Sequence, residues 1–292
     1  MKQFLFSFIL VLLISCNGKE EAIQVAQDFD IQKKEKPTTS WKTGTASYET
    51  IARRINVPRG YIRSEVNKES FQNYLRNLKL KPKGASVYFY NGSIKHNNGV
   101  YTDVIDLEIG DQDLHQCADA VMRLKAEYLW TQKQFHKIYF NFTNGHRVEY
   151  SKWREGYRMK VSGNKTWWEK ETSTSDSFDD FWNYLELIFM YAGTASLEKE
   201  MDPVKISKVE IGNVLIQGGY PGHAVIIVDE AMHQVSGKKV FLLAQSFMPA
   251  QEIQILANPN HENLSPWYEL SEGLINTPEW NFTSNDLKRF KE

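Results

Sequence analysis

Residues 211–229 read IGNVLIQGGYPGHAVIIVD, and this stretch decides the fold class. It contains two apolar runs separated by a turn segment with glycines and a proline, and a third apolar run follows at residues 240–244. Short apolar runs bounded by turn residues are typical of buried β-strands. Consecutive strands joined by short turns pair antiparallel, so the late part of the chain predicts an antiparallel meander.

Helical patterns precede this meander. Apolar residues recur at three- and four-residue spacing across residues 111–130, which predicts the clearest helix of the chain, capped by Asp111 or Asp113. A second helix is predicted over residues 177–201, broken near Gly193. Helices combined with antiparallel strands predict an α+β fold.

The composition is that of a globular protein. The chain has 292 residues, of which 41% are hydrophobic, and it is long enough to bury a sizeable core in one large or two small domains. We predict a single α+β domain over residues 46–292. The formal net charge of −1 and the lack of a basic stripe argue against a nucleic-acid partner.

The N-terminus predicts export. Residues 1–15 contain Lys2 and a short apolar run, which is typical of a signal peptide, and with Cys16 they resemble the bacterial lipobox. That resemblance implies cleavage before Cys16, lipidation of its thiol, and a tether over residues 16–45. Residues 19–21 resemble the charged export signal of Bacteroidota surface lipoproteins, and an acidic solvated tether explains them equally well. We expect a cell-envelope protein attached to a membrane through its lipid alone. Whether it faces the periplasm or the cell surface is left undecided.

Cys117 lies in the first turns of the helix predicted over residues 111–130. A helix N-terminus carries partial positive charge and unpaired N–H groups, both of which favour the nucleophilic thiolate. If Cys16 carries lipid, Cys117 has no disulfide partner, which favours a catalytic thiol; a buried structural thiol is the alternative. Gln112 and Gln116, just upstream, are candidates for binding an oxyanion or the substrate.

His223 is the candidate base, since it opens an apolar strand and glycines clear space around it. A turn that needs glycine for its backbone angles is the alternative explanation of those glycines. If Val228 pairs with Val240, His223 faces Gln245, which would orient its ring. If residues 236–237 form a tight turn instead, His223 faces Ala250. Asp229 is too far along the strand to serve.

A helix-borne Cys117, a strand-borne His223 and a polar residue on the next strand resemble the papain-like cysteine hydrolases, and most closely the NlpC/P60 cell-wall peptidases. The resemblance covers residues 110–247. It implies hydrolysis of a peptide or cell-wall peptide by a Cys117–His223–Gln245 triad, without a cofactor. The chain departs from the pattern at Gln116, where an acid is usual, at Asn213, where Asp is frequent, and in a long insert between the cysteine and the histidine.

The chain also resembles a family of uncharacterised Bacteroidota lipoproteins, a domain of unknown function, in the segments FNFTNG, CADAVMRL, PGHAV and LAQS. That resemblance supports the lipoprotein prediction and implies no activity. The oligomeric state is left open.

A non-catalytic surface lipoprotein that binds glycan or peptide is the alternative function, and a degenerate hydrolase fold kept for binding is a variant of it. Aromatic clusters suited to stacking on sugars occur at residues 167–168, at residues 267–268 and at Trp280, although core packing is the commoner fate of such residues. No histidine or cysteine shows the spacing of a metal site, so no metal is expected.

Overall fold

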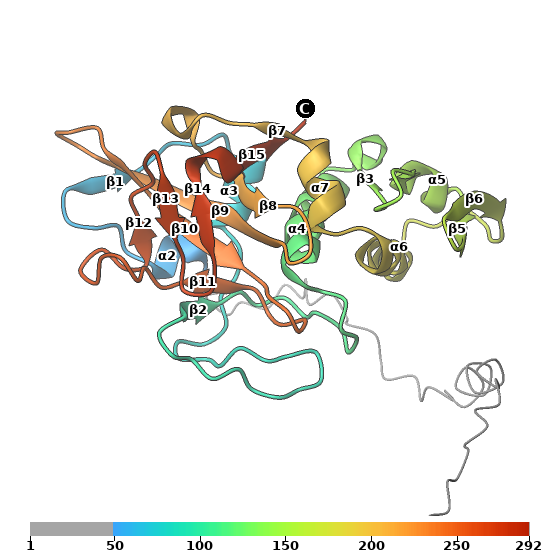
Figure 1. Ribbon diagram of the computed structural model, residues 1–292, viewed down its shortest axis with the longest axis horizontal. Helices are drawn as coiled ribbons and strands as arrows, with labels where there is room; N and C mark the ends of the chain where they lie inside the picture. The colour runs from blue at the N-terminus through green and yellow to red at the C-terminus, as the bar shows by residue number, and fades with distance from the viewer. Residues whose placement is uncertain (1–48, 292) are drawn as a thin grey trace, which may run out of the picture. The chain divides into compact units, whose positions relative to one another are not determined.

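The computed structural model describes residues 49–291. Its main element is a nine-stranded sheet in the order β2-β11-β10-β9-β8-β15-β7, with β1 added to β9 and β12 to β10 (Figure 1). Every pairing in it is antiparallel. The strands are β1 (Tyr61–Arg63), β2 (Tyr101–Val104), β7 (Met201–Pro203), β8 (Val214–Gln217), β9 (His223–His233), β10 (Lys239–Gln245), β11 (Gln254–Leu256), β12 (Trp267–Tyr268) and β15 (Leu287–Phe290).

The helices of the described residues complete an α+β fold, which confirms the predicted class. They are α2 (Ile51–Arg54), α3 (Phe71–Arg76), α4 (Cys117–Thr131), α5 (Tyr150–Arg154), α6 (Phe178–Tyr191) and α7 (Thr194–Glu200). The interruption predicted near Gly193 is confirmed, because α6 ends before this residue and α7 begins after it. None of the helices within residues 49–291 has the length and hydropathy needed to cross a membrane.

The two faces of β9 contribute to two separate hydrophobic cores. Ala224 and Ile226 belong to the larger core, which includes the apolar residues of α4 and α6. Val225 and Ile227 belong to a smaller core with residues of β10, β15 and the hairpin formed by β13 (Leu274–Asn276) and β14 (Asn281–Thr283). Alternate side chains of a strand point to opposite faces, so β9 is buried on both sides.

Helix α4 begins later than predicted. Its first residue is Cys117, so neither Asp111 nor Asp113 is its N-cap; Gln116 holds that position. The backbone N–H of Gln116 donates to Asp119 Oδ2 at 2.9 Å. The helix therefore starts with the candidate thiol in its first position, against β9.

The segment between α4 and α7 forms the predicted insert. It contains α5, α6, the hairpin of β3 (Tyr139–Asn141) with β4 (Arg147–Glu149), and the hairpin of β5 (Tyr157–Ser162) with β6 (Lys165–Lys170). Figure 1 shows this green-to-yellow segment beside α4 and away from the large sheet. Its buried aromatic side chains join the larger core.

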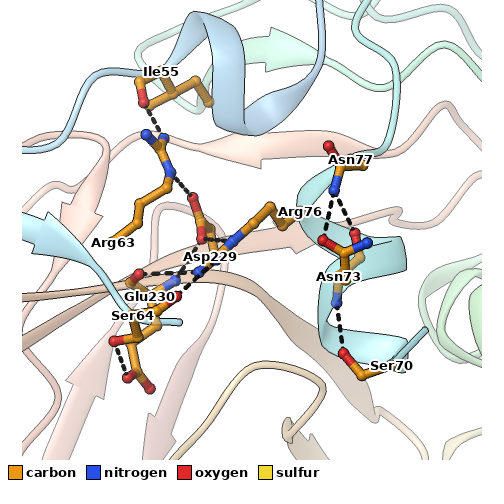
Figure 2. A network of polar contacts seen from close by, with 9 residues as sticks. All are labelled: Ile55, Arg63, Ser64, Ser70, Asn73, Arg76, Asn77, Asp229 and Glu230. Atoms are coloured by element: carbon orange, nitrogen blue, oxygen red, sulfur yellow. Dashed lines mark hydrogen bonds and ion pairs between the residues drawn. The ribbon is translucent and has the colours of Figure 1, made fainter. Parts of the chain in front are cut away.

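A buried ionic network attaches β1 and α3 to β9 (Figure 2). The fully buried carboxylate of Asp229 accepts from Arg63 Nε and from Arg76 Nε, each at 2.7 Å. Arg76 also donates to the carbonyl oxygen of Ser64 at 2.8 Å, and Ser64 Oγ donates to Glu230 Oε1 at 2.5 Å. Asp229 therefore has a structural role at the far end of β9.

The register of β9 with β10 differs from both predicted pairings. Val240 pairs with Ala231, and a bulge between Leu242 and Leu243 shifts the remainder so that Ala244 pairs with Ile226. A bulge adds one residue to one strand and so changes every later pairing, which no counting from the turn can anticipate. His223 pairs with Gln217 of β8 on its other side.

Candidate functional site

His223 is the first residue of β9 and is fully buried. The glycines before His223 allow α7 to approach the chain closely. They do not leave open space around the ring. A Cβ atom on Gly222 would clash with Thr194 Oγ1 of α7 and lie 2.7 Å from the carbonyl oxygen of Gly219. Gly219 has φ of +144°, which side chains rarely tolerate. The prediction that these glycines clear space around His223 was therefore wrong.

The ring of His223 is bonded to Gln245, the last residue of β10. His223 Nε2 lies 2.8 Å from Gln245 Oε1. Aromatic rings surround the pair, with ring centroids at 4.7 Å for Phe247, 5.3 Å for Trp280 and 5.9 Å for Phe282. His223 and Gln245 are hydrogen-bonded, as expected, although Gln245 is not the strand partner of His223.

The amide of Gln245 is itself held by an acid. Gln245 Nε2 donates to Glu279 Oε2 at 2.6 Å, and Lys95 Nζ donates to the same oxygen at 2.6 Å. Neither Glu279 nor Lys95 was identified from the sequence. They lie 34 and 150 positions away from Gln245 along the chain, in loops with no motif of their own.

His223 is neutral near pH 7. Burial lowers the pKa of His223 to about 4, the Gln245 hydrogen bond opposes this, and Lys95 lowers the pKa further. The Nδ1 atom is buried and has no hydrogen-bond partner within residues 49–291. A buried ring nitrogen without a partner is unusual, and it leaves one basic lone pair available.

Cys117 lies beside the strand that begins with His223. The backbone N–H of Ala224, the next residue of β9, lies next to the Cys117 sulfur. Cys117 is a free thiol, only 5% exposed. Its sulfur makes no hydrogen bond to His223 Nδ1, since that nitrogen has no partner in the described chain.

The thiol is not activated in this structure. Burial raises the pKa of Cys117 to about 11 and Asp119 adds to the rise, while the N–H groups of Ala224, Ala118 and Cys117 itself act in the opposite direction. The expectation that the helix N-terminus yields a thiolate is therefore wrong for this conformation. Desolvation of the charged form outweighs the helix dipole.

Gln116 and Gln112 differ in their surroundings. Gln116 Nε2 donates to Asp113 Oδ1 at 3.0 Å, and that oxygen also accepts from the Ala250 N–H at 2.6 Å. Gln112 is exposed, and its carbonyl oxygen accepts from the Leu114 N–H. The Gln116 amide therefore fixes the segment before α4, while the Gln112 side chain remains at the surface.

Asn213, at the position where the NlpC/P60 pattern often has Asp, holds a turn. It is buried, and its Oδ1 accepts from the Glu210 N–H at 3.0 Å. Within residues 49–291, no group of three histidine, cysteine or acidic side chains is arranged to hold a metal ion.

The three aromatic clusters have different environments. Trp267 and Tyr268 are buried in the core, and Trp280 Nε1 donates to Gln217 Oε1 at 2.9 Å beside His223. Trp167 is 42% exposed and lines a shallow groove between the β3–β4 and β5–β6 turns. The other lining residues are Asn144, Gly145, His146, Asn164, Lys165 and Thr166.

A known protein family matches most of the chain. The family model DUF4846, described as Domain of unknown function (4846), matches residues 51–289. No curated protein and no solved structure matches the chain. The match includes Cys117, His223, Gln245, Glu279 and Lys95.

Proposed function

The chain belongs to the DUF4846 family of domains of unknown function, and from the geometry of its site we propose that it is a cysteine hydrolase of the papain-like class. Its substrate is an amide bond in a peptide or in the peptide stem of the cell wall. Cys117 is the nucleophile, His223 the general base and Gln245 the residue that orients the ring. The observation that carries the proposal is the buried, unpartnered Nδ1 atom of His223.

The hydrogen bond to Gln245 supports this role for Nδ1. Because Gln245 Oε1 accepts, Nε2 of the neutral ring carries the proton and donates, so Nδ1 keeps its lone pair. The neighbouring N–H of Ala224 lies at the Cys117 sulfur. Cys117 and His223 begin two elements that contact one another, α4 and β9, and the proposed reaction requires the thiol to come within hydrogen-bond reach of Nδ1.

The reaction proceeds in two acyl transfers. The Cys117 sulfur attacks the substrate carbonyl carbon while its proton passes to His223 Nδ1. The imidazolium then returns that proton to the leaving amine as the C–N bond breaks and a thioester remains. Water, deprotonated by His223, attacks the thioester, and the thiol and a carboxylic acid are released.

The pKa values of the resting groups set a condition on this reaction. With His223 near 4 and Cys117 near 11, moving the proton between them costs about 10 kcal/mol. The resting pair is therefore neutral, and proton transfer accompanies bond formation. Entry of the substrate also has to expose side chains that are buried here.

The reactivity of Cys117 tests the proposal without a known substrate. In a full-length Cys16→Ser protein, Cys117 is the single thiol. We expect iodoacetamide to alkylate Cys117 at pH 7 at least about tenfold faster than in the same protein carrying His223→Gln. Equal rates in the two folded proteins would contradict the proposal and support a degenerate fold kept for binding.

Glycan binding is the second candidate, favoured by the groove at Trp167. An exposed indole offers a flat face for the C–H groups of a sugar, and the side chains of Asn144 and Asn164 border it. The Trp167 indole donates to Glu169 Oε1 at 2.7 Å, which holds the ring in place. This site is independent of Cys117.

Binding to insoluble cell-wall glycan, measured by co-sedimentation, tests this second candidate. We expect Trp167→Ala to reduce the bound fraction about tenfold, and Tyr88→Ala, which removes an aromatic ring of similar exposure (41%), to leave it unchanged. Equal binding by the Trp167→Ala protein would exclude the groove.

Attachment to the cell envelope through lipid on Cys16 is part of the proposal and is supported by the sequence of residues 1–16, which lie outside the described residues. Cys16→Ser should move the protein from the membrane fraction of the expressing cells to the soluble fraction. Retention of the Cys16→Ser protein in the membrane fraction would contradict lipid attachment at this residue.

A further inference from the structure

We propose that Glu279, held by Lys95, is a positioning residue that sets the orientation of the Gln245 amide and thereby the tautomer of His223. Its role in catalysis rests on the proposed function, whereas its effect on the tautomer does not. The chain of contacts runs from Lys95 through Glu279 and Gln245 to the ring, and each contact is 2.6–2.8 Å long.

The chemistry of the carboxylate sets the direction of the chain. An ionised carboxylate only accepts hydrogen bonds, so the NH₂ group of Gln245 has to face Glu279. The carbonyl oxygen of the same amide then faces His223, where it only accepts. The ring must therefore donate from Nε2, and its Nδ1 is left without a proton.

The opposite arrangement is repulsive at the contact with Glu279. A flipped Gln245 amide would place Oε1 against the carboxylate of Glu279 and the NH₂ group against His223. His223 would then accept at Nε2 and carry its proton on Nδ1, which is the tautomer that cannot take a proton from Cys117. In a buried site such unmatched polar contacts cost more than they would in water.

Lys95 holds the Glu279 carboxylate in place, with its Nζ 2.6 Å from Oε2. The Lys95 side chain is 9% exposed and that of Glu279 22%. Burial lowers the pKa of Lys95, whereas the hydrogen bond and the charge of Glu279 raise it.

The turn that carries Glu279 is fixed independently. Both the N–H and the Oγ1 of Thr277 donate to the carbonyl oxygen of Trp280, at 2.9 and 2.6 Å. Trp280 in turn packs against the ring of His223. The same turn therefore supplies a wall of the site and the acid that orients its amide.

The tautomer of His223 is the test, because a purely structural ion pair would not change it. In the full-length Cys16→Ser protein labelled with ¹⁵N-histidine, the nitrogen chemical shifts distinguish the two tautomers, and His223→Gln identifies the signal. We expect Nε2–H alone in the parent protein and a mixture of tautomers in Glu279→Leu. Glu279→Gln should restore Nε2–H, because its amide oxygen can accept from Gln245.

Glu127→Leu is the matched control. Like Glu279, Glu127 is an acid paired with a cation, Arg123 at 2.7 Å, and Gln245 is not among its hydrogen-bond partners. If Glu279→Leu does not fold, Lys95→Met gives the second measurement, because it removes the ammonium group whose hydrogen bond holds Glu279 Oε2 at Gln245. Mixed tautomers are expected there too.

The outcomes separate this inference from the proposed function. An unchanged Nε2–H tautomer in folded Glu279→Leu or Lys95→Met would overturn it. A changed tautomer, accompanied by alkylation of Cys117 that slows in proportion to the lost fraction of the Nε2–H form, supports both, since only that form leaves Nδ1 free to take the proton. A changed tautomer in a protein whose alkylation does not depend on His223 supports the positioning role and contradicts the hydrolase.

Discussion

His223 Nε2 lies 2.8 Å from Gln245 Oε1, although the two residues are not paired across β9 and β10. Ala244 pairs with Ile226, so Gln245 is displaced along its strand from the position opposite His223. The long glutamine side chain spans this diagonal, as side chains on one sheet face can. The contact therefore depends on side-chain length as well as on strand register.

Gln245→Leu should destabilise the protein by about 1–3 kcal/mol. The substitution keeps the size of the side chain but leaves His223 Nε2 without its acceptor and Glu279 with one donor fewer, and unpaired buried polar groups carry the full cost of desolvation. Urea denaturation at pH 7 measures the effect. Gln217→Leu is the control at the edge of the same cluster, and we expect it to lower the stability less than Gln245→Leu. A larger loss of stability in Gln217→Leu would contradict this prediction.

Acid should destabilise the folded protein through His223. Its folded pKa of about 4 lies below the ordinary value of 6.5, so the unfolded chain binds more protons between these values and stability falls as the pH drops. The free energy of unfolding relative to that of His223→Gln should decrease by about 3 kcal/mol from pH 6.5 to pH 4. Denaturation curves at several pH values test this, and a difference independent of pH would contradict the low pKa.

Asp229→Ala should cost about 3–5 kcal/mol, because it leaves the guanidinium groups of Arg63 and Arg76 partly buried without their shared carboxylate (Figure 2). Asp176→Ala is the matched control, since Asp176 pairs with Arg154 at the surface and its loss should change the stability far less. Thermal denaturation of both variants gives the comparison. Similar losses for the two would show that burial of Asp229 is not the cause.

Gly222→Ala should destabilise the protein by about 1–3 kcal/mol, because the added methyl group meets Thr194 of α7 and two carbonyl oxygens. Gly193→Ala is the control, since nothing lies within 4 Å of a Cβ atom at that position. We expect the Gly222 variant to shift the start of β9 and so to change the His223 signals in NMR spectra. An unchanged stability and spectrum would contradict the tight contact with α7.

Several elements followed from local pattern. The spacing of apolar residues indicates which face of an element is buried. It therefore predicted the strands within residues 211–229, the helix that carries Cys117 and the break near Gly193. The prediction of Asp111 or Asp113 as the N-cap of α4 was wrong, because Gln116 holds this position. Aspartate is common near helix starts, and only the backbone geometry decides at which residue the helix begins.

The sequence by itself determined the α+β class, the order of the main elements and the two candidates Cys117 and His223 taken singly, because each of these depends on residues close together in the chain. Only the tertiary structure decided that Lys95 and Glu279 complete the chain behind His223, that a bulge sets the register, and that the Cys117 thiol has a pKa near 11 and not a lowered one. The physical reason is that partners across a fold, and the loss of water around a group, come from segments that no local spacing connects.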